Sequence, residues 1–408
     1  MTPPEASPTR GSGAAVSVGE RSVALVCWYD YYLHRYLLAL IATLSEQGHE
    51  VFAVAAPGEY VGELEAAGAT FVPWRVTSRS INPVGELRSV LDLRRIYKQL
   101  RPSLAHHFTV KSNIYGAFAA RMAGVPATVA TVTGLGYTLT NPTVKARTIG
   151  RWVRPLYKLS YRMTDIVTFQ NRDDRKTIAG DSAASKAVHI PGGSGVDLEY
   201  WDPDAPKDGD IDRLRHELDV NEGDRVVALV GRMLWEKGVD EYRQAAEQLS
   251  RLAPRTKFIL VGATRDGVSG YIPSAQLRGW AGGGSFSYLG ERQDVREILA
   301  LADVVVLPSY SEGTPRVLLE ASAMARPMVT SDAPGCRDVV EHGVTGLLVP
   351  ARDADALAEA ILSLLNDAEL RARYGAAARR RAEAEFDQRG VVRSYLSIYE
   401  RLWGATAA

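Results

Sequence analysis

The sequence predicts an α/β protein made of two doubly wound units, each built on a parallel sheet, that face each other across a cleft. Short apolar, largely β-branched runs alternate with segments of helical period, and the alternation starts afresh beyond residue 200. Strands that are apolar throughout indicate a parallel sheet covered on both faces. The Gly-, Asp- and Pro-rich segment 191–206 predicts the joint between the units. Ligands of such units bind beyond the carboxyl ends of the strands, which places a site in the cleft.

The first unit is expected to span residues 21–200. It follows residues 1–20, whose Pro-, Ser-, Gly- and Ala-rich composition predicts a disordered tail. Apolar runs predict strands over 23–28, 50–55, 70–72, 127–132 and 166–169. Helical periodicity predicts helices over 33–47, 90–100, 114–123 and 151–163, and another helix that ends at 66–68.

The second unit is expected to span residues 201–387. Its apolar runs predict strands over 225–230, 257–261, 287–289, 304–307, 327–330 and 346–349, most of them separated by amphipathic helices. Residues 388–408 predict a last helix, clearest over 391–403, and we expect it to cross back to the first unit.

The composition is typical of a soluble globular protein, with 46% of the 408 residues hydrophobic and 24% charged, and it excludes collagen-like, disordered and disulfide-framework classes. Basic and acidic side chains number 48 each, but this balance conceals an asymmetry. Residues 1–200 hold 22 basic and 16 acidic side chains, whereas the remainder holds 26 and 32. Such asymmetry predicts that the first unit meets an anionic surface.

The two cysteines, Cys27 and Cys336, are widely separated and predict free thiols in a reducing compartment. The first twenty residues lack the apolar core of a signal peptide. The longest apolar runs, 23–29 and 36–42, are far shorter than the ~20 residues of a membrane-spanning helix. We therefore expect a cytoplasmic chain, or one that touches the membrane only from its inner face.

Arg232 and Lys237 lie in the segment between the strand expected over 225–230 and a helix expected over 240–252. The strand end places both cations at the mouth of the cleft, and the N-terminus of the helix points the same way. Cations, amide donors and the helix dipole together suit a diphosphate. Two solvated charges on a loop are the alternative for this segment by itself.

Glu312 and Glu320 lie in segment 309–320, which follows the strand expected over 304–307 and opens a helix. Ionised carboxylates accept hydrogen bonds from sugar hydroxyls, and the amides of Gly313 and Thr314 are expected to meet a sugar or a phosphate. Acidic residues placed to suit a helix dipole are the alternative.

Glycines in segments 334–336 and 341–349 by themselves indicate only tight turns. The order and spacing of all these features, however, resemble the signature of the family 4 glycosyltransferases, which are retaining enzymes with the two-Rossmann-domain fold called GT-B. The resemblance extends from about residue 23 to about residue 387. In the first half, segments 106–113 and 131–136 are similar to bacterial transferases that build glycans on undecaprenyl diphosphate, including those that add N-acetylgalactosamine to diphospho-undecaprenol-linked bacillosamine.

The sequence departs from the family pattern at two places. Thr133 stands where many relatives have a histidine near the donor sugar, which leaves the donor identity open. Residues 28–31, rich in aromatic side chains, replace the usual glycine pair of the first loop, and this replacement is expected to reshape the acceptor side.

The resemblance implies a hexosyltransferase that moves a hexose or N-acetylhexosamine from a nucleotide sugar, expected to be a UDP-sugar, to a lipid-diphosphate-linked saccharide. It implies that Arg232 and Lys237 bind the donor diphosphate, that Glu312 contacts the donor sugar and that Glu320 contacts the ribose. It favours front-face attack, with Glu312 positioning the donor and not acting as a nucleophile. No metal or other cofactor is expected, because cations can stabilise the leaving diphosphate and the Asp-x-Asp sequence at 202–204 lies in the joint.

The basic, aromatic-interleaved stretch 145–162 predicts a helix that lies on an anionic membrane surface and holds a lipid-linked diphosphate. The candidate contacts for the acceptor or the membrane are Lys111, Asn113, Thr133, Arg147, Arg151, Arg154 and Lys158. A core helix with a solvated basic face is the alternative. Nucleic acid is not an expected partner, because a second basic stripe and a recognition motif are missing. His106 and His107, at a strand end, either line the cleft or belong to the core.

Other functions stay open at this point. They are transfer to a soluble small-molecule acceptor, a sugar-nucleotide epimerase or hydrolase of the same architecture, and a catalytically silent nucleotide-binding or scaffold protein. The intact set of Arg232, Lys237, Glu312 and Glu320 disfavours the silent protein.

Overall fold

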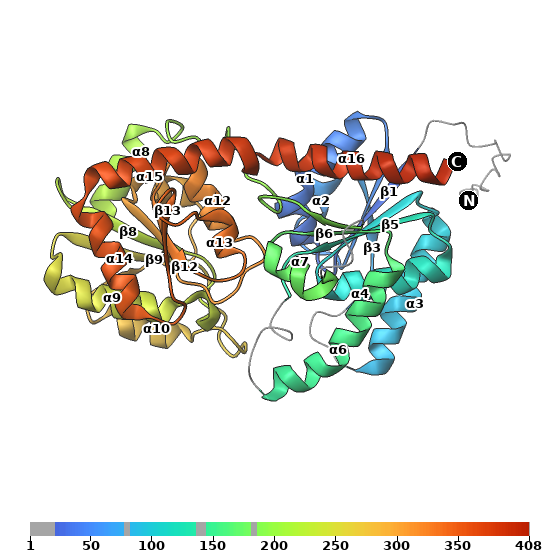
Figure 1. The fold of residues 1–408 in the computed structure, drawn as a ribbon, viewed down its shortest axis with the longest axis horizontal. Helices are drawn as coiled ribbons and strands as arrows, with labels where there is room; N and C mark the ends of the chain where they lie inside the picture. The colour runs from blue at the N-terminus through green and yellow to red at the C-terminus, as the bar shows by residue number, and fades with distance from the viewer. Residues whose placement is uncertain (1–20, 77–81, 136–143, 181–185, 408) are drawn as a thin grey trace, which may run out of the picture.

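The computed structural model describes residues 21–76, 82–135, 144–180 and 186–407, so the tail expected over 1–20 lies outside the described residues. Two α/β domains lie side by side along the long axis of the molecule (Figure 1). Each contains a parallel sheet with helices on both faces, which confirms the predicted doubly wound architecture.

The N-terminal domain is built on a parallel sheet of strand order β3-β2-β1-β4-β5-β6-β7. Its strands are β1 (Ser22–Val26), β2 (Glu50–Ala55), β3 (Ala69–Pro73), β4 (Leu104–Phe108), β5 (Ala127–Val132), β6 (Ile166–Phe169) and β7 (Ala187–His189). Its helices are α1 (Asp30–Glu46), α2 (Val61–Ala66), α3 (Pro83–Leu100), α4 (Val110–Ala123), α6 (Val144–Met163) and α7 (Arg172–Ala179). The order reverses beside β1, so the turns after β1 and β4 open into the same crevice.

The C-terminal domain repeats this plan with a parallel sheet of order β10-β9-β8-β11-β12-β13. Its strands are β8 (Arg225–Val230), β9 (Thr256–Val261), β10 (Ser287–Tyr288), β11 (Val304–Leu307), β12 (Met328–Ser331) and β13 (Gly346–Val349). Its helical segments are α8 (Asp208–Glu217), η1 (Trp235–Lys237), α9 (Val239–Leu252), α10 (Ser274–Ala281), α11 (Val295–Leu301), α12 (Arg316–Ala323), α13 (Cys336–Val339), α14 (Ala354–Asn366), α15 (Ala368–Arg381) and η2 (Ala382–Phe386).

The last helix, α16 (Gln388–Ala407), leaves the C-terminal domain and runs along the N-terminal domain (Figure 1). It buries Val391, Tyr395, Tyr399 and Trp403 in the same apolar cluster as β1 and α1. The chain therefore crosses between the domains twice, once in each direction, which limits how far they can move apart.

His106 anchors α16 from inside the N-terminal domain. Its Nδ1 lies 2.5 Å from the Tyr399 hydroxyl, and its Nε2 lies 2.6 Å from Thr131 Oγ1. His106 and the adjacent His107 are fully buried, and burial lowers the pKa of both imidazoles. Both histidines belong to the core and do not line the cleft.

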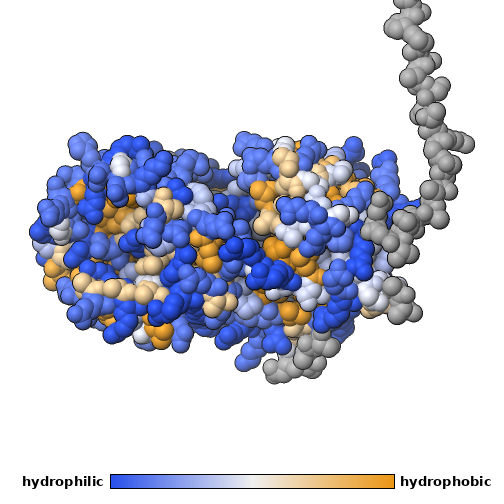
Figure 2. Space-filling model, turned by 90° about the horizontal axis from the view of Figure 1, so that it is seen from above, coloured by the Kyte–Doolittle hydropathy of each residue, from blue (hydrophilic) through white to orange (hydrophobic). Residues whose placement is uncertain are grey.

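The surface is mostly hydrophilic on the face shown in Figure 2, where small apolar groups are separated by polar ones. Within the described ranges, no helix combines the length and apolar character needed to cross a bilayer. Cys27 and Cys336 are free and buried, and burial raises the pKa of each thiol to about 12.

Candidate active site

The two domains enclose a cleft at the carboxyl ends of their central strands, with a cavity of about 340 Å³. Side chains of both domains line it. Those of the N-terminal domain and the joint are Tyr29, Tyr31, Tyr32, Arg35, Tyr36, Thr109, Thr133, Gln170 and Ser194. Those of the C-terminal domain include Arg232, Lys237, Glu312, Gly313, Thr314, Arg316 and Glu320. The structure thus brings all six predicted donor-site residues to one wall and Thr133 to the other.

Arg232 and Lys237 follow β8 as the sequence predicts. Lys237 Nζ forms an ion pair with the Glu312 carboxylate, and both side chains are largely shielded from solvent. The pKa of Arg232 is raised: desolvation in the cleft acts to lower it, but the Tyr271 hydroxyl and the Glu312 carboxylate outweigh that effect. Arg232 therefore stays charged at neutral pH, beside a cavity large enough for a ligand.

Glu312 is held in place from several directions. Its Oε1 accepts a hydrogen bond of 2.6 Å from Ser309 Oγ in addition to the Lys237 ion pair. With its acceptor oxygen engaged by two donors, this carboxylate has a fixed orientation toward the cleft.

The Glu312–Gly313 backbone is clamped between the domains. A Cβ at Gly313 would lie 2.2 Å from the carbonyl oxygen of Thr133, so only glycine permits this approach. On the other side, a Cβ at Gly335 would lie 2.6 Å from the carbonyl oxygens of both Glu312 and Gly313, and Gly335 has a φ of +78°. We call the loop at 312–314 the donor loop. The turn at 334–336 supports this loop by packing against it, which agrees with the interpretation of 334–336 as a tight turn.

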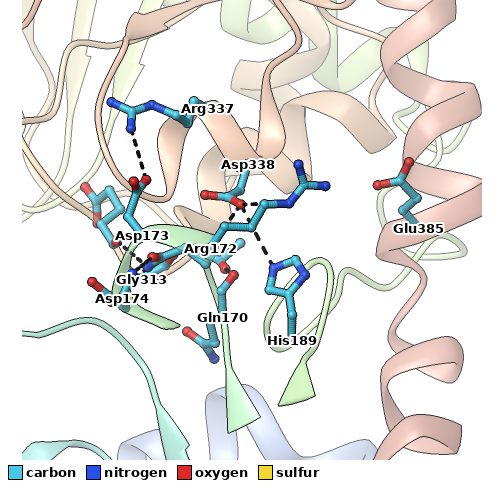
Figure 3. A network of polar contacts seen from close by, with 12 residues as sticks. Gln170, Arg172, Asp173, Asp174, His189, Gly313, Arg337, Asp338 and Glu385 are labelled. Atoms are coloured by element: carbon cyan, nitrogen blue, oxygen red, sulfur yellow. Dashed lines mark hydrogen bonds and ion pairs between the residues drawn. The ribbon is translucent and has the colours of Figure 1, made fainter. Parts of the chain in front are cut away.

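Residues of the N-terminal domain complete this clamp in the region of Gln170 and Gly313 (Figure 3). Asn171 Nδ2 donates hydrogen bonds of 3.1 and 3.0 Å to the carbonyl oxygens of Glu312 and Gly313. Thr314 Oγ1 donates one of 2.9 Å to the Gln170 carbonyl oxygen. These contacts fix the donor loop from the neighbouring domain, so domain arrangement and loop geometry are coupled.

An ion-pair network surrounds the clamp (Figure 3). Arg337 Nη1 lies 3.1 Å from Asp173 Oδ2, and the Arg172 amide donates a hydrogen bond of 3.3 Å to Asp338 Oδ1. Burial raises the pKa of Asp174, beside Asn171, to about 6. The network joins the N-terminus of α7 to α13 across the domain boundary.

Glu320 lies 4% exposed on α12 and lines the cleft. Its Oε1 lies 3.0 Å from Arg316 Nε and 3.2 Å from Arg35 Nη2 of the opposite domain. Sequence reasoning missed both arginines, because they lie next to recognised features without forming a motif. The spacing of Arg316 four residues before Glu320 on a helix was a usable signal.

Of three residues expected to contact the acceptor, Thr133, Lys111 and Asn113, the structure brings only the first to the cleft. Thr133 lines the cleft. Lys111 is paired with Glu86 at 3.0 Å on α3. Asn113 is buried, and its Nδ2 donates to the Thr131 carbonyl oxygen at 2.9 Å. Neither Lys111 nor Asn113 reaches the cavity wall, since α4 turns their side chains toward neighbouring elements of their own domain.

The described basic side chains of α6 lie on its exposed face. Arg151, Arg154 and Lys158 are exposed, together with Leu156 and Leu159. The side chain of Arg147 lies outside the described part of the structure. These positions are remote from the residues that line the cleft.

Among the described residues, no group of three or more His, Cys, Asp or Glu side chains could hold a metal ion. The positive charge in the cleft comes from arginine and lysine.

Comparison with protein families gives two matches that together extend over both domains. The family model described as Glycosyl transferase 4-like matches residues 24–171, and the model described as Glycosyl transferases group 1 matches residues 210–381. The match to residues 210–381 contains all the cleft-lining residues of the C-terminal domain, which form the donor wall.

Two curated bacterial proteins are similar over most of their length. The N,N'-diacetylbacillosaminyl-diphospho-undecaprenol alpha-1,3-N-acetylgalactosaminyltransferase of Campylobacter jejuni is 28% identical over 91% of this chain and 96% of its own. The UDP-Gal:alpha-D-GlcNAc-diphosphoundecaprenol alpha-1,3-galactosyltransferase of Escherichia coli is 28% identical over 74% of this chain and 76% of its own.

Among solved structures, a sucrose-phosphate synthase from Thermosynechococcus elongatus superposes with a TM-score of 0.80 at 20% identity, over 94% of this chain and 100% of that chain. This likeness shows the shared fold.

Proposed function

The chain belongs to the group 1 glycosyltransferases with the GT-B fold, and from this premise we propose that it transfers a hexose or N-acetylhexosamine from a UDP-sugar, with retention of configuration, to a lipid-diphosphate-linked saccharide. The observation that carries the proposal is the cleft itself, in which two cations and two carboxylates of one domain face an aromatic wall of the other. Both curated relatives described above are named for transfer to diphospho-undecaprenol-linked sugars.

The proposed chemistry is departure of a nucleoside diphosphate from the anomeric carbon. Negative charge then grows on the leaving phosphate, and fixed cations stabilise it without reorganisation. Arg232 and Lys237 are suited to this role because they are basic side chains that border the cavity. We propose that they act without a metal or other cofactor.

The proposed role of Glu312 is to orient the donor sugar and Lys237. Its carboxylate is already engaged by Lys237 and Ser309, an arrangement that supports positioning more than nucleophilic attack. We therefore favour front-face attack, in which a donor phosphate oxygen takes the proton of the acceptor hydroxyl. Glu320 would accept hydrogen bonds from the ribose hydroxyls, with Arg316 and Arg35 holding its carboxylate.

Two helices of the N-terminal domain support a peripheral membrane location on the cytoplasmic face. Both α3 and α6 pack against α4 and reach the lower edge of the domain (Figure 1). Large apolar side chains are exposed on each: Val84, Leu87 and Leu91 on α3, and Leu156 and Leu159 on α6. Apolar side chains among exposed cations are the combination that binds anionic bilayers.

Membrane binding predicts a salt-sensitive interaction with anionic vesicles. A variant with Arg151, Arg154 and Lys158 all changed to Ser is expected to lose most co-sedimentation with phosphatidylglycerol vesicles, because each cation near such a surface contributes about 1 kcal/mol. A matched variant with Arg213, Arg251 and Arg255 changed to Ser, all exposed on the other domain, is expected to bind like the wild type. Equal loss in both variants, or no binding by the wild type, would contradict the membrane proposal.

Acceptor-dependent release of UDP tests the function itself. The protein is incubated with a panel of UDP-sugars, with and without a lipid-diphosphate-linked saccharide, and free UDP is measured. We expect one sugar to give release that requires the lipid-linked acceptor. Release without any acceptor would indicate a hydrolase, and conversion of the sugar without release would indicate an epimerase. Release that requires a soluble acceptor would indicate a small-molecule transferase.

A further inference from the structure

Four tyrosines line the wall of the cleft that faces the donor residues. Tyr29, Tyr31, Tyr32 and Tyr36 all come from the turn after β1 and the first two turns of α1. Tyr32 is buried, and Tyr29 and Tyr36 are partly buried, whereas Tyr31 keeps 41% of its surface exposed. An exposed aromatic ring at the edge of a ligand cavity is the combination that marks a binding contact.

The Tyr31 ring is held by its neighbours. Its centroid lies 6.4 Å from that of Tyr29, with an angle of 24° between the planes, and 5.4 Å from that of Tyr60. The ring is thus supported by aromatic contacts while part of it faces outward. A supported ring binds a flat ligand at a low cost in side-chain entropy.

The backbone under Tyr31 is fixed by a buried carboxylate. Asp30 Oδ1 accepts a hydrogen bond of 2.8 Å from the Tyr31 amide, and Asp30 Oδ2 accepts one of 3.0 Å from the Tyr60 amide. Gly58 packs so closely on this carboxylate that a Cβ there would lie 2.5 Å from Asp30 Oδ1. The position of Tyr31 is therefore set by the fold and needs no ligand to form it.

The tyrosine wall lies opposite the donor residues. Tyr29 and Arg232 line the same cavity from opposite sides. Arg35 of α1 reaches Glu320 across the cleft. A sugar bound against the tyrosines would therefore lie beside the donor wall, where an acceptor hydroxyl has to be.

We infer that Tyr31 is the stacking platform for a pyranose ring of the acceptor saccharide and determines which acceptors are used. The apolar C–H face of a pyranose packs on an aromatic ring, while its hydroxyls remain free for polar neighbours such as Arg35 and Thr133. This assignment rests on the proposed transfer to a saccharide and adds the contact that recognises it.

The test compares Tyr31→Ala and Tyr31→Phe in the full-length protein, with the wild type's preferred UDP-sugar and saccharide acceptor from the panel. Stacking predicts that Tyr31→Ala raises the acceptor KM about tenfold, and that Tyr31→Phe, which keeps the ring, stays within about threefold of the wild type. The dissociation constant for UDP, measured by calorimetry, is expected to be unchanged in both variants. Tyr200→Ala, which removes a similarly exposed tyrosine in the joint, is the matched control and is expected to behave like the wild type.

An acceptor KM for Tyr31→Ala within about twofold of the wild type would overturn the inference, and so would an equal weakening of UDP binding. The wild type's choice between lipid-linked and lipid-free saccharides tests the proposed function separately. If it uses only a lipid-free saccharide, the lipid part of that function fails while the ratio of the Tyr31→Ala to the wild-type KM still tests the platform.

Discussion

Lys237→Ala and Arg232→Ala are each expected to lower kcat by about 10²- to 10³-fold while leaving the fold intact. Each change removes a fixed cation from the position where charge develops on the leaving diphosphate, and the loss of one such group costs this much in other enzymes. Both side chains border the cavity and neither belongs to an apolar core cluster, so the melting temperature should change little.

The matched control for this prediction is Lys257→Ala. Lys257 is also paired with a carboxylate, Asp219 at 2.9 Å, but it lies on the outside of the C-terminal domain. The Lys257→Ala variant is expected to retain wild-type turnover. Wild-type-like turnover in Lys237→Ala or in Arg232→Ala would show that the residue changed does not stabilise the leaving diphosphate.

Trp403→Ala is expected to lower the free energy of unfolding by about 3–5 kcal/mol, the range for a large aromatic side chain removed from a core. The Trp403 ring is buried in the N-terminal domain core, packs against Tyr399 at 5.9 Å, and donates a hydrogen bond of 3.0 Å from Nε1 to Ser103 Oγ. Loss of the Trp403 ring would weaken the packing of α16 against the N-terminal domain.

Chemical denaturation of the Trp403→Ala variant measures this effect. Arg401→Ala, two residues earlier and exposed on the same helix, is the control and should stay within about 0.5 kcal/mol of the wild type. A similarly small change for Trp403→Ala would show that α16 contributes little to the stability of the N-terminal domain.

The sequence predicts most of the fold because its main signals are local. Apolar runs mark the strands of both sheets, and the residues that directly follow β8 and β11 lie at the cleft because parallel strands end at one edge. Two strands of the first sheet have no range among those expected from the sequence: β4 (Leu104–Phe108), whose apolar run is interrupted by His106 and His107, and β7 (Ala187–His189), whose three residues carry too little pattern. Helix α4 begins at Val110, four residues before the start expected from the sequence. Polar residues in its first turn obscure the helical period there.

The parts of the site that the sequence could not predict depend on long-range contacts. Arg35 and Glu320 meet although 285 residues separate them. Asn113 was expected to contact the acceptor, but the structure buries it. The sequence does not show which way α4 turns this side chain. The clamp of Asn171 on Gly313 likewise joins two loops that no local pattern connects.

We expect the protein to move a sugar from a nucleotide to a lipid-diphosphate-linked saccharide with its anomeric configuration retained. The most direct test incubates the wild-type protein with its preferred UDP-sugar and the lipid-linked saccharide, then analyses the product by mass spectrometry and proton NMR. The expected product is an acceptor heavier by one hexose or N-acetylhexosamine, joined through the same anomeric configuration as in the donor. An acceptor of unchanged mass in the presence of free UDP, or a product of inverted configuration, would contradict it.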